Sequence, residues 1–245
     1  MTDLHVHTLF SDGRNTPEEM VLAAIEKGLT TIGISDHSYI SFDTGWFMEK
    51  EKIPEYRAEI ARLKEKYRGR IEVLCGIEQD YWTEIPAVGY DYVIGSVHYV
   101  YKDGVHLPVD AAREIQVRAV NEHFSGDFYA YAEAYFELVG DVVRVTNADI
   151  IGHFDLVSKF NEDGTLFDEQ HPRYRAAWQK AADRLLATGK TFEINTGAMF
   201  RGCRTQPYPN REMRAYLSER GARVIRNGDC HRTEAIAYAA DAVID

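Results

Sequence analysis

The sequence predicts an α/β fold in which parallel strands form a barrel within one domain that spans residues 1–245. Short apolar runs rich in β-branched residues recur along the chain with helical stretches between them, which is typical of repeated βα units. A chain of 245 residues can form one α/β barrel or two smaller domains. Because no linker rich in Pro, Gly or Ser divides the chain, we expect one barrel.

Seven strands and six helices are expected in alternation. The strands are expected at 4–7, 31–35, 72–78, 92–96, 149–152, 191–194 and 222–225. The first helix follows Thr16, which can cap it, with Pro17 at the first position, Glu19 completing a capping box and Gly28 ending it. The other helices are expected at 54–67, 110–124, 128–139, 173–188 and 211–221.

Composition narrows the classes of partner and compartment. Lys and Arg number 28 against 39 Asp and Glu, and the net charge of −11 disfavours binding to nucleic acid or to an anionic membrane. A small diffusing substrate fits this charge better. The three cysteines, Cys75, Cys203 and Cys230, form no disulfide framework or zinc-module spacing. The sequence has no signal-peptide pattern and no run of 18 apolar residues, so we expect a cytoplasmic protein without a membrane span.

The opening stretch "DLHVHTLFSDG" contains two histidines in alternation. Side chains at i and i+2 of a strand point to the same face, so His5 and His7 can present two imidazoles side by side. This arrangement suits a metal ion, and Asp12 follows shortly after the pair.

The other histidines and several carboxylates also fall where expected strands end. Six of the nine histidines lie at such positions. The candidate ligands are His5, His7, Asp12, His37, Glu78, His98, His153, Asp229 and His231. A lone histidine such as His98 is more often structural, but strand ends meet at the C-terminal face of a barrel, where catalytic groups gather. The whole set therefore predicts a metal site.

The number of candidate ligands indicates more than one metal ion. Nine ligands exceed the four that a tetrahedral zinc takes, so two or three divalent ions that share a carboxylate are expected, with Glu78 as the natural bridge. Imidazole and carboxylate together suit Zn, Mn or Fe. Clustered divalent ions activate water and stabilise phosphoryl oxygens, so hydrolysis of a phosphate ester is the leading reaction.

The motifs together resemble the PHP (polymerase and histidinol phosphatase) superfamily. They are "DLHVHT", "SDG", "SDH", "GIE", "GSVH", "GHFD" and "GDCH", in this order from Asp3 to His231. The resemblance implies a distorted, TIM-like (β/α)7 barrel with a trinuclear metal site at the C-terminal face of the strands. It implies a first metal held by His5, His7, Glu78 and Asp229, a second by Asp12, His37 and His231, and a third by Glu78, His98 and His153.

Within this superfamily the chain looks most like the stand-alone histidinol phosphatases of histidine biosynthesis. The resemblance implies hydrolysis of L-histidinol phosphate by a metal-bridging hydroxide, with Glu78, Asp229 and His231 as catalytic residues. It places Lys159, Arg201 and Arg204 at the substrate phosphate. Surface positions for these three cations are the structural alternative.

Some alternatives stay open on the sequence alone. The nearest is a PHP phosphoesterase that acts on a nucleotide or another small phosphomonoester. An amidohydrolase also begins with HxH, but its bridge is commonly a carboxylated lysine; a noncatalytic metal-binding module would be expected to lack ligands. Asn227 and Gly228 depart from the Ser-Ser or Gly-Ser that many relatives have before the last aspartate, while Asp3 is expected to position structure. Asp80, next to the "GIE" motif, is either a contact for the substrate's ammonium or imidazole or an exposed loop carboxylate.

Overall fold

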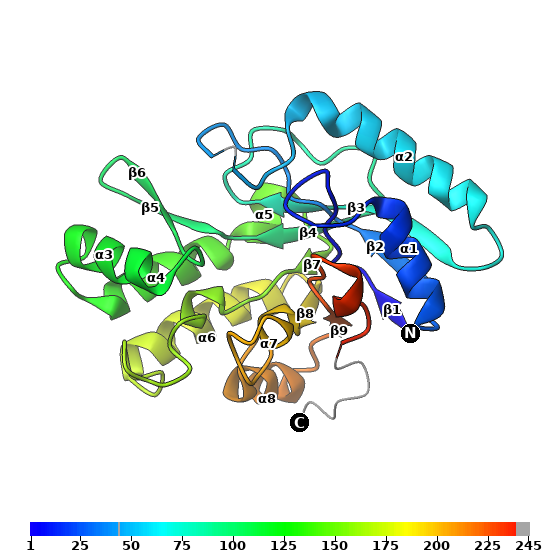
Figure 1. The fold of residues 1–245 in the computed structure, drawn as a ribbon. Coiled ribbons are helices and arrows are strands. Elements are labelled where there is room, and N and C mark those ends of the chain that lie inside the picture. The colour runs from blue at the N-terminus through cyan, green and yellow to red at the C-terminus, as the bar shows by residue number, and fades with distance from the viewer. Residues whose placement is uncertain (44, 239–245) are drawn as a thin grey trace.

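Seven parallel strands form the centre of the protein (Figure 1). The structure, a computed structural model, describes residues 1–43 and 45–238. The strands are β1 (Thr2–Asp3), β2 (Thr31–Ile34), β3 (Glu72–Asp80), β4 (Tyr92–Ser96), β7 (Ile150–Ile151), β8 (Thr191–Asn195) and β9 (Val224–Asn227). They follow one another in the sheet in chain order, and each hydrogen-bonded pair is parallel. Right-handed βα units produce this order.

The sheet curves until its first and last strands meet. Val6, just beyond β1, forms a parallel bridge with Cys230, just beyond β9. His7 N donates to Cys230 O at 2.8 Å, and Cys230 N donates to His5 O at 2.9 Å. The barrel is therefore nearly closed, as the expected (β/α)7 fold requires.

Helices lie around the outside of the barrel (Figure 1). The helices are α1 (Pro17–Glu26), α2 (Ile53–Lys66), α3 (Arg113–His123), α4 (Phe128–Val139), α5 (Val142–Thr146), α6 (Pro172–Leu186), α7 (Gly197–Phe200) and α8 (Arg211–Glu219). Short 3-10 turns lie at Lys50–Lys52, Leu156–Ser158 and Thr233–Ala235. One apolar core joins α1 and α2 to β2 and β3, and another joins α4 and α6 to β7 and β8. The expected capping box at Thr16 and Glu19 is present.

Tyr92 at the start of β4 fills the inside of the barrel. Its hydroxyl donates to Leu4 O at 2.5 Å. A Cβ atom at Gly33 of β2 or Gly76 of β3 would stand within 2.2 Å of the Tyr92 side chain. These two glycines make room for the ring, so the N-terminal half of the barrel is packed and the opposite end is left for polar groups.

The first strand is shorter than the expected 4–7. Its ladder covers only Thr2–Asp3, because side chains take over the pairing beyond it. Leu4 N donates to Asn227 Oδ1 at 3.0 Å, and Val6 N donates to Ser35 Oγ at 3.1 Å. His5 and His7 nevertheless point the same way, with ring centroids 5.0 Å apart.

A hairpin lies between β4 and α3, where no strand was expected. It consists of β5 (Tyr99–Lys102) and β6 (Val105–Pro108), paired antiparallel. The turn residues Asp103 and Gly104 have φ of 51° and 83°, the left-handed values of a tight hairpin turn. The Asp-Gly pair between alternating residues is the signal that predicts such a hairpin.

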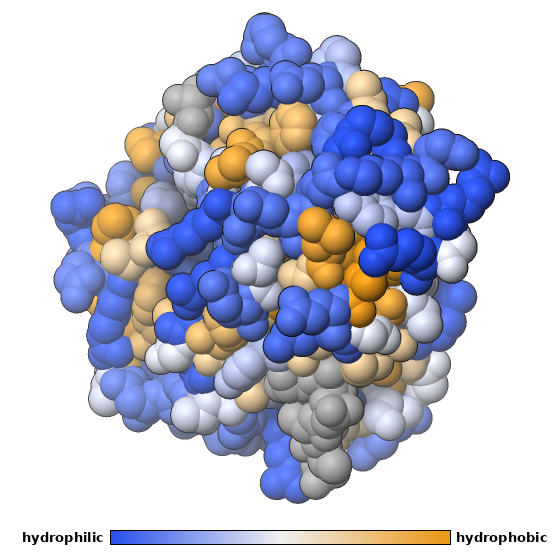
Figure 2. All heavy atoms as spheres, turned by 45° about the vertical axis from the view of Figure 1, so that its right-hand side comes forward, coloured by the Kyte–Doolittle hydropathy of each residue, from blue (hydrophilic) through white to orange (hydrophobic). Residues whose placement is uncertain are grey.

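The face of the molecule that Figure 2 shows is mostly hydrophilic. The face in Figure 2 is predominantly blue, with apolar groups in separate patches. Among the described residues, none of the helices combines the length and the apolar character that crossing a bilayer requires.

Candidate metal centre

The structure brings all nine candidate ligands together at the C-terminal end of the barrel. Glu78, near the end of β3, is central to them. Its Oε2 atom lies 2.8 Å from His37 Nδ1, 3.2 Å from His5 Nε2 and 3.6 Å from His7 Nε2. Its Oε1 atom lies 2.9 Å from His153 Nε2 and 3.5 Å from His98 Nε2. The two Glu78 oxygens thus face different histidines, as a bridging carboxylate would.

Three groups have ligand atoms close enough to hold metal ions. Within each group these atoms lie within 4.8 Å of one another. The groups are His7, Asp12, His37 and His231; His5, His7 and Asp229; and His37, Glu78 and His98. His7 and His37 each take part in two groups, which differs from the division that the resemblance implies.

Several atoms of the cluster have no hydrogen-bond partner although they are buried. They are His5 Nε2, both ring nitrogens of His7, His37 Nδ1 and Glu78 Oε2. Buried polar groups are normally hydrogen-bonded, and leaving one without a partner costs about 1–3 kcal/mol. Atoms that converge without hydrogen-bond geometry fit divalent ions between them, so these residues have the donors and the placement for a multinuclear metal centre.

The carboxylates of the cluster are held in their charged form. Burial opposes the charge on Glu78, but the nearby His37 and His5 outweigh burial and hold the pKa of Glu78 well below its usual value. For Asp229 burial is outweighed by Arg201 and His5, which likewise keep the pKa of Asp229 far below normal. Both carboxylates are therefore available as anionic ligands at neutral pH.

His7 is held in its neutral form. Burial first, and then the neighbouring His231 and His37, lower the pKa of His7 to about 3. Its ring stacks on His231 with centroids 4.2 Å apart. A neutral imidazole offers a lone pair, which is the form that ligates a metal.

Buried carboxylates behind the cluster position some of the ligands. Asp80 accepts from His98 Nδ1 at 2.9 Å and from the backbone N–H groups of His98 and Trp82. It is fully buried and occupied by these bonds, so the substrate contact considered for Asp80 has no support. Asp36 accepts from Thr8 N at 2.7 Å and from Ser11 Oγ, and thereby fixes the loop that carries Asp12.

A pocket of about 410 Å³ opens beside the cluster. Ligand candidates form one part of its lining, and Trp46, Asp110, Lys159 and Arg201 are among its other lining residues. The Trp46 ring stands edge-on to His98, with centroids 5.4 Å apart. The pocket thus combines an aromatic wall with three cations, Arg14, Lys159 and Arg201, next to the candidate metal centre.

The three predicted phosphate-binding cations occupy different places. Lys159 Nζ lies 3.2 Å from Asp110 Oδ2, and Arg201 Nη2 lies 3.1 Å from Asp229 Oδ2. Arg204 is 6% exposed, and its Nη1 donates to Ser158 O at 3.0 Å and to Ser158 Oγ at 2.7 Å. Lys159 and Arg201 line the pocket, whereas Arg204 braces the segment just before Lys159 and is not among the lining residues.

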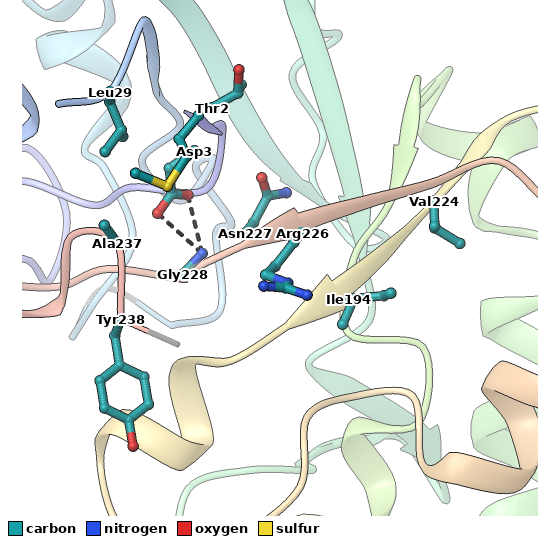
Figure 3. A pocket seen from close by; sticks show the side chains of 11 residues that line it. Thr2, Asp3, Leu29, Ile194, Val224, Arg226, Asn227, Gly228, Ala237 and Tyr238 are labelled. Carbon is teal, nitrogen blue, oxygen red and sulfur yellow. Dashed lines mark hydrogen bonds between the residues drawn. The ribbon is translucent and has the colours of Figure 1, made fainter. Parts of the chain in front are cut away.

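Asn227 and Gly228, the departure noted in the sequence, have defined contacts. Gly228 N donates to Asp3 Oδ1 at 3.0 Å and to Asp3 Oδ2 at 3.2 Å, as the dashed lines in Figure 3 mark. A Cβ atom on Gly228 would stand 2.3 Å from Cys230 Sγ. Asn227 accepts from Leu4 N. These residues close the seam between β1 and β9 beneath the site, and Asp3 has the positioning role that was expected.

Some residues around the site were not found from the sequence. Glu193 on β8 accepts from His5 Nδ1 at 2.6 Å, and Arg14, Trp46 and Asp110 line the pocket. A carboxylate inside the apolar run "TFEIN" is the signal that identifies Glu193, since a buried charge needs a partner. For the pocket residues the sequence holds no comparable signal, because loops bring them to the mouth.

A comparison with known families decides the classification. The model of the PHP domain matches residues 3–197, which include most of the candidate ligands. The chain belongs to the PHP family. A curated relative matches nearly the whole chain: a protein named "Probable histidinol-phosphatase" from Deinococcus radiodurans is 31% identical over 99% of this chain and 91% of that protein. This PHP chain is a phosphoesterase of the hydrolase class, similar to histidinol phosphatases.

Solved structures share the fold of this PHP chain. A Listeria monocytogenes protein superposes with a TM-score of 0.85 at 21% identity, covering 99% of this chain and all of that one. The histidinol phosphate phosphatase of Lactococcus lactis, solved with Zn, L-histidinol and phosphate, superposes with a TM-score of 0.72 at 21% identity and covers 98% and 91% of the two chains. The seven-stranded barrel is therefore the PHP fold.

Proposed function

We propose that this protein hydrolyses L-histidinol phosphate to L-histidinol and phosphate at the Glu78 cluster, with two to three divalent ions of Zn, Mn or Fe. The observation that carries the proposal is the placement of the pocket, which has the candidate metal centre on one side and Lys159 and Arg201 at its lining. The name of the Deinococcus radiodurans relative and the ligands of the Lactococcus lactis enzyme support this substrate.

The proposed metal ligands are the nine side chains of the cluster. His5, His7, Glu78 and Asp229 would hold one ion, Asp12, His37 and His231 a second, and Glu78, His98 and His153 a third. Divalent ions bound there supply an activated water at neutral pH and stabilise charge on the phosphoryl oxygens. Among the residues themselves, Glu78 has five imidazoles within 3.6 Å of its two oxygens, and its low pKa keeps it anionic.

Lys159 and Arg201 have donors left for the substrate phosphate. Arg201 Nη2 donates to the Asp229 carboxylate and its Nη1 donates to Asp229 O, which leaves other N–H groups of its five available. Lys159 Nζ donates to Asp110 O and Asp110 Oδ2, which leaves one of three protons. These remaining donors can bind phosphate oxygens and orient the ester for in-line attack.

Asp229 and His231 would assist the departure of the alcohol. His231 is 23% exposed at its side chain and lies 3.1 Å from Asp12 Oδ2, so it stands at the open side of the site. A group there can hold a proton for the leaving oxygen, while Asp229 holds Arg201 in place. Arg204 would act on phosphate only through Lys159, by bracing Ser158.

Asp110 supports a substrate whose leaving group carries positive charge. Its Oδ1 atom has no hydrogen-bond partner among the described residues, and its Oδ2 atom pairs with Lys159. L-Histidinol carries an ammonium group, which a carboxylate at the pocket lining can bind. A nucleotide has no such cation near its phosphate, so Asp110 favours the amino alcohol over the nucleotide alternative.

Phosphate release from a panel of phosphomonoesters tests the proposal. The purified protein, supplied separately with Mn, Fe or Zn, is expected to show its highest kcat/KM with L-histidinol phosphate. Asp110→Asn is expected to lower kcat/KM for L-histidinol phosphate about tenfold while sparing p-nitrophenyl phosphate. Only L-histidinol phosphate has an ammonium group that can contact Asp110. A clear preference of the unmodified protein for a nucleotide would overturn the substrate assignment.

A further inference from the structure

A buried carboxylate on β8 touches the candidate metal centre from behind. Glu193 has no exposed surface. Its Oε1 atom accepts from His5 Nδ1 at 2.6 Å and from Asn227 Nδ2 at 2.9 Å. Its Oε2 atom accepts from His153 N and from Asn195 Nδ2, each at 2.9 Å. Four donors thus occupy the lone pairs of the two oxygens, and the carboxylate has one possible orientation.

The contact with His5 determines which ring nitrogen is free. An ionised carboxylate only accepts, so the proton on this side of His5 must be on Nδ1. His5 Nε2 then points away from Glu193, has no hydrogen-bond partner, and lies 3.2 Å from Glu78 Oε2 and 3.9 Å from Asp229 Oδ1. Nε2 is thus the ring nitrogen that faces the cluster. When a metal displaces the proton on Nε2, this nitrogen has a lone pair for the metal.

The contact with His153 joins a second part of the cluster to the same carboxylate. His153 follows β7, on the other side of the barrel seam from His5, and its Nε2 lies 2.9 Å from Glu78 Oε1. Glu193 therefore connects two histidines that approach opposite oxygens of Glu78. A rotation of Glu193 would move both.

We propose that Glu193 is a positioning residue of the metal centre, which fixes His5 in the Nδ1–H tautomer and sets the separation between His5 and His153. This inference rests on the proposed metal binding at the Glu78 cluster. Carboxylates that hold the second nitrogen of a ligating histidine orient the ring and make it more basic. Asp80 and His98 form the same kind of pair at 2.9 Å, so two histidines of the cluster have carboxylate support.

Asn227, one of the two residues that differ from the pattern of many relatives, also takes part in this positioning. It donates to Glu193 through Nδ2 and accepts from Leu4 N through Oδ1, one residue before His5. A serine at position 227 is too short to make both contacts. Asn227 therefore fixes the position of Glu193 relative to the segment that carries His5. This is the structural role of residue 227 in this chain.

Zinc affinity of a Glu193→Gln variant tests the proposal. Glutamine has one acceptor oxygen, so it loses two of the four bonds in either orientation. The metal-free protein is titrated with zinc against a chromophoric chelator, and we expect the tightest zinc to bind about 10–100-fold more weakly in the variant. Glu169→Gln is the matched control, because Glu169 also accepts from two asparagine amides but lies outside the cluster.

The outcomes separate this inference from the proposed function. Unchanged zinc affinity in a folded Glu193→Gln variant would overturn the role of Glu193 alone, whereas an unmodified protein without zinc binding would overturn the proposed metal centre. If the variant does not fold, nitrogen-15 NMR of the unmodified zinc-loaded protein decides. The proposal expects the His5 proton on Nδ1 with zinc on Nε2, and the reverse arrangement would contradict it.

Discussion

The candidate metal centre has an inner part and an outer part that differ in exposure. The inner side chains of His5 and Glu78 are 0% and 1% exposed, while the outer side chains of Asp12 and His231 are 26% and 23% exposed. His5 Nε2 and Glu78 Oε2 lack hydrogen bonds, whereas Asp12 and His231 pair with each other at 3.1 Å. Water can compensate the outer pair when no metal is bound, but it cannot reach the inner atoms.

This difference indicates how the two parts divide the work. Inner ligands that are desolvated and backed by Asp80 or Glu193 keep their geometry through packing, so they are suited to hold ions tightly. Outer ligands meet the pocket and solvent, so they are suited to contact a substrate that enters and leaves. Four predictions test this division, in order of decreasing effect.

Replacing the bridge should have the largest effect. In Glu78→Gln the inner part loses its central anion and keeps several imidazoles facing one neutral amide. We expect phosphate release to fall by about 10³-fold or more, together with a loss of bound metal measured by elemental analysis. Full activity with normal metal content would refute the bridging role, and Glu84→Gln, at an exposed position, serves as control.

Removing an outer ligand should affect fewer ions. For His231→Ala we expect one metal ion fewer per chain and an activity loss of about 100-fold, because the inner ligands remain intact. Metal content and activity are measured on the same sample. If this variant loses all bound metal, the inner and outer parts do not bind independently.

Removing a pocket cation should change substrate binding without changing metal content. Arg201 is about one-third exposed at its side chain, which reduces the strength of its contacts. We expect Arg201→Ala to lower kcat/KM about tenfold, mainly through KM, as the loss of one charge-assisted hydrogen bond would. An unchanged KM would remove Arg201 from the phosphate site; a drop in metal content would place its role at Asp229 instead.

The smallest expected effect is a dependence of stability on pH in the metal-free protein. Burial lowers the pKa values of His5, His37, His98 and His153, but nearby carboxylates, Glu78 among them, outweigh it and raise each above 6.5. The stability from a raised pKa is present below the unfolded value of about 6.5 and is lost as pH rises through the folded value. We therefore expect the free energy of unfolding to fall by about 1 kcal/mol or more between pH 6.5 and 8.5.

Urea unfolding with and without zinc checks this dependence. With zinc bound the sign should reverse, because protons compete with the metal for the same nitrogens and zinc binds more tightly as pH rises. A metal-free protein that becomes more stable over this pH range would contradict the assigned charge states of the inner histidines.

The sequence predicted the position of the candidate ligands better than that of the residues behind them. His5, His37, Glu78 and Asp229 could be found because parallel strands of a barrel end at one face, so position along the chain gives position in space. The same rule does not apply to a carboxylate behind a ligand. The contact between Glu193 and His5 forms only because the barrel closes and places β8 beside the first histidine.

Two further features that were not expected have opposite causes, one local in the sequence and one dependent on the whole fold. The hairpin β5–β6 could be predicted from Asp103-Gly104, because that pair favours a left-handed turn. The position of Arg204 could not, since its contact with Ser158 joins residues 46 positions apart across two loops. Loop contacts of this kind depend on the whole fold and leave no periodic pattern in the sequence.

Anomalous diffraction at the zinc edge, from crystals grown with zinc and phosphate, tests the central claim most directly. The account predicts at least two zinc peaks at the C-terminal end of the barrel, with the two oxygens of Glu78 bound to different ions and phosphate between these ions and Arg201. Zinc peaks that leave Glu78 without a metal contact, or phosphate bound away from the cluster, would contradict it.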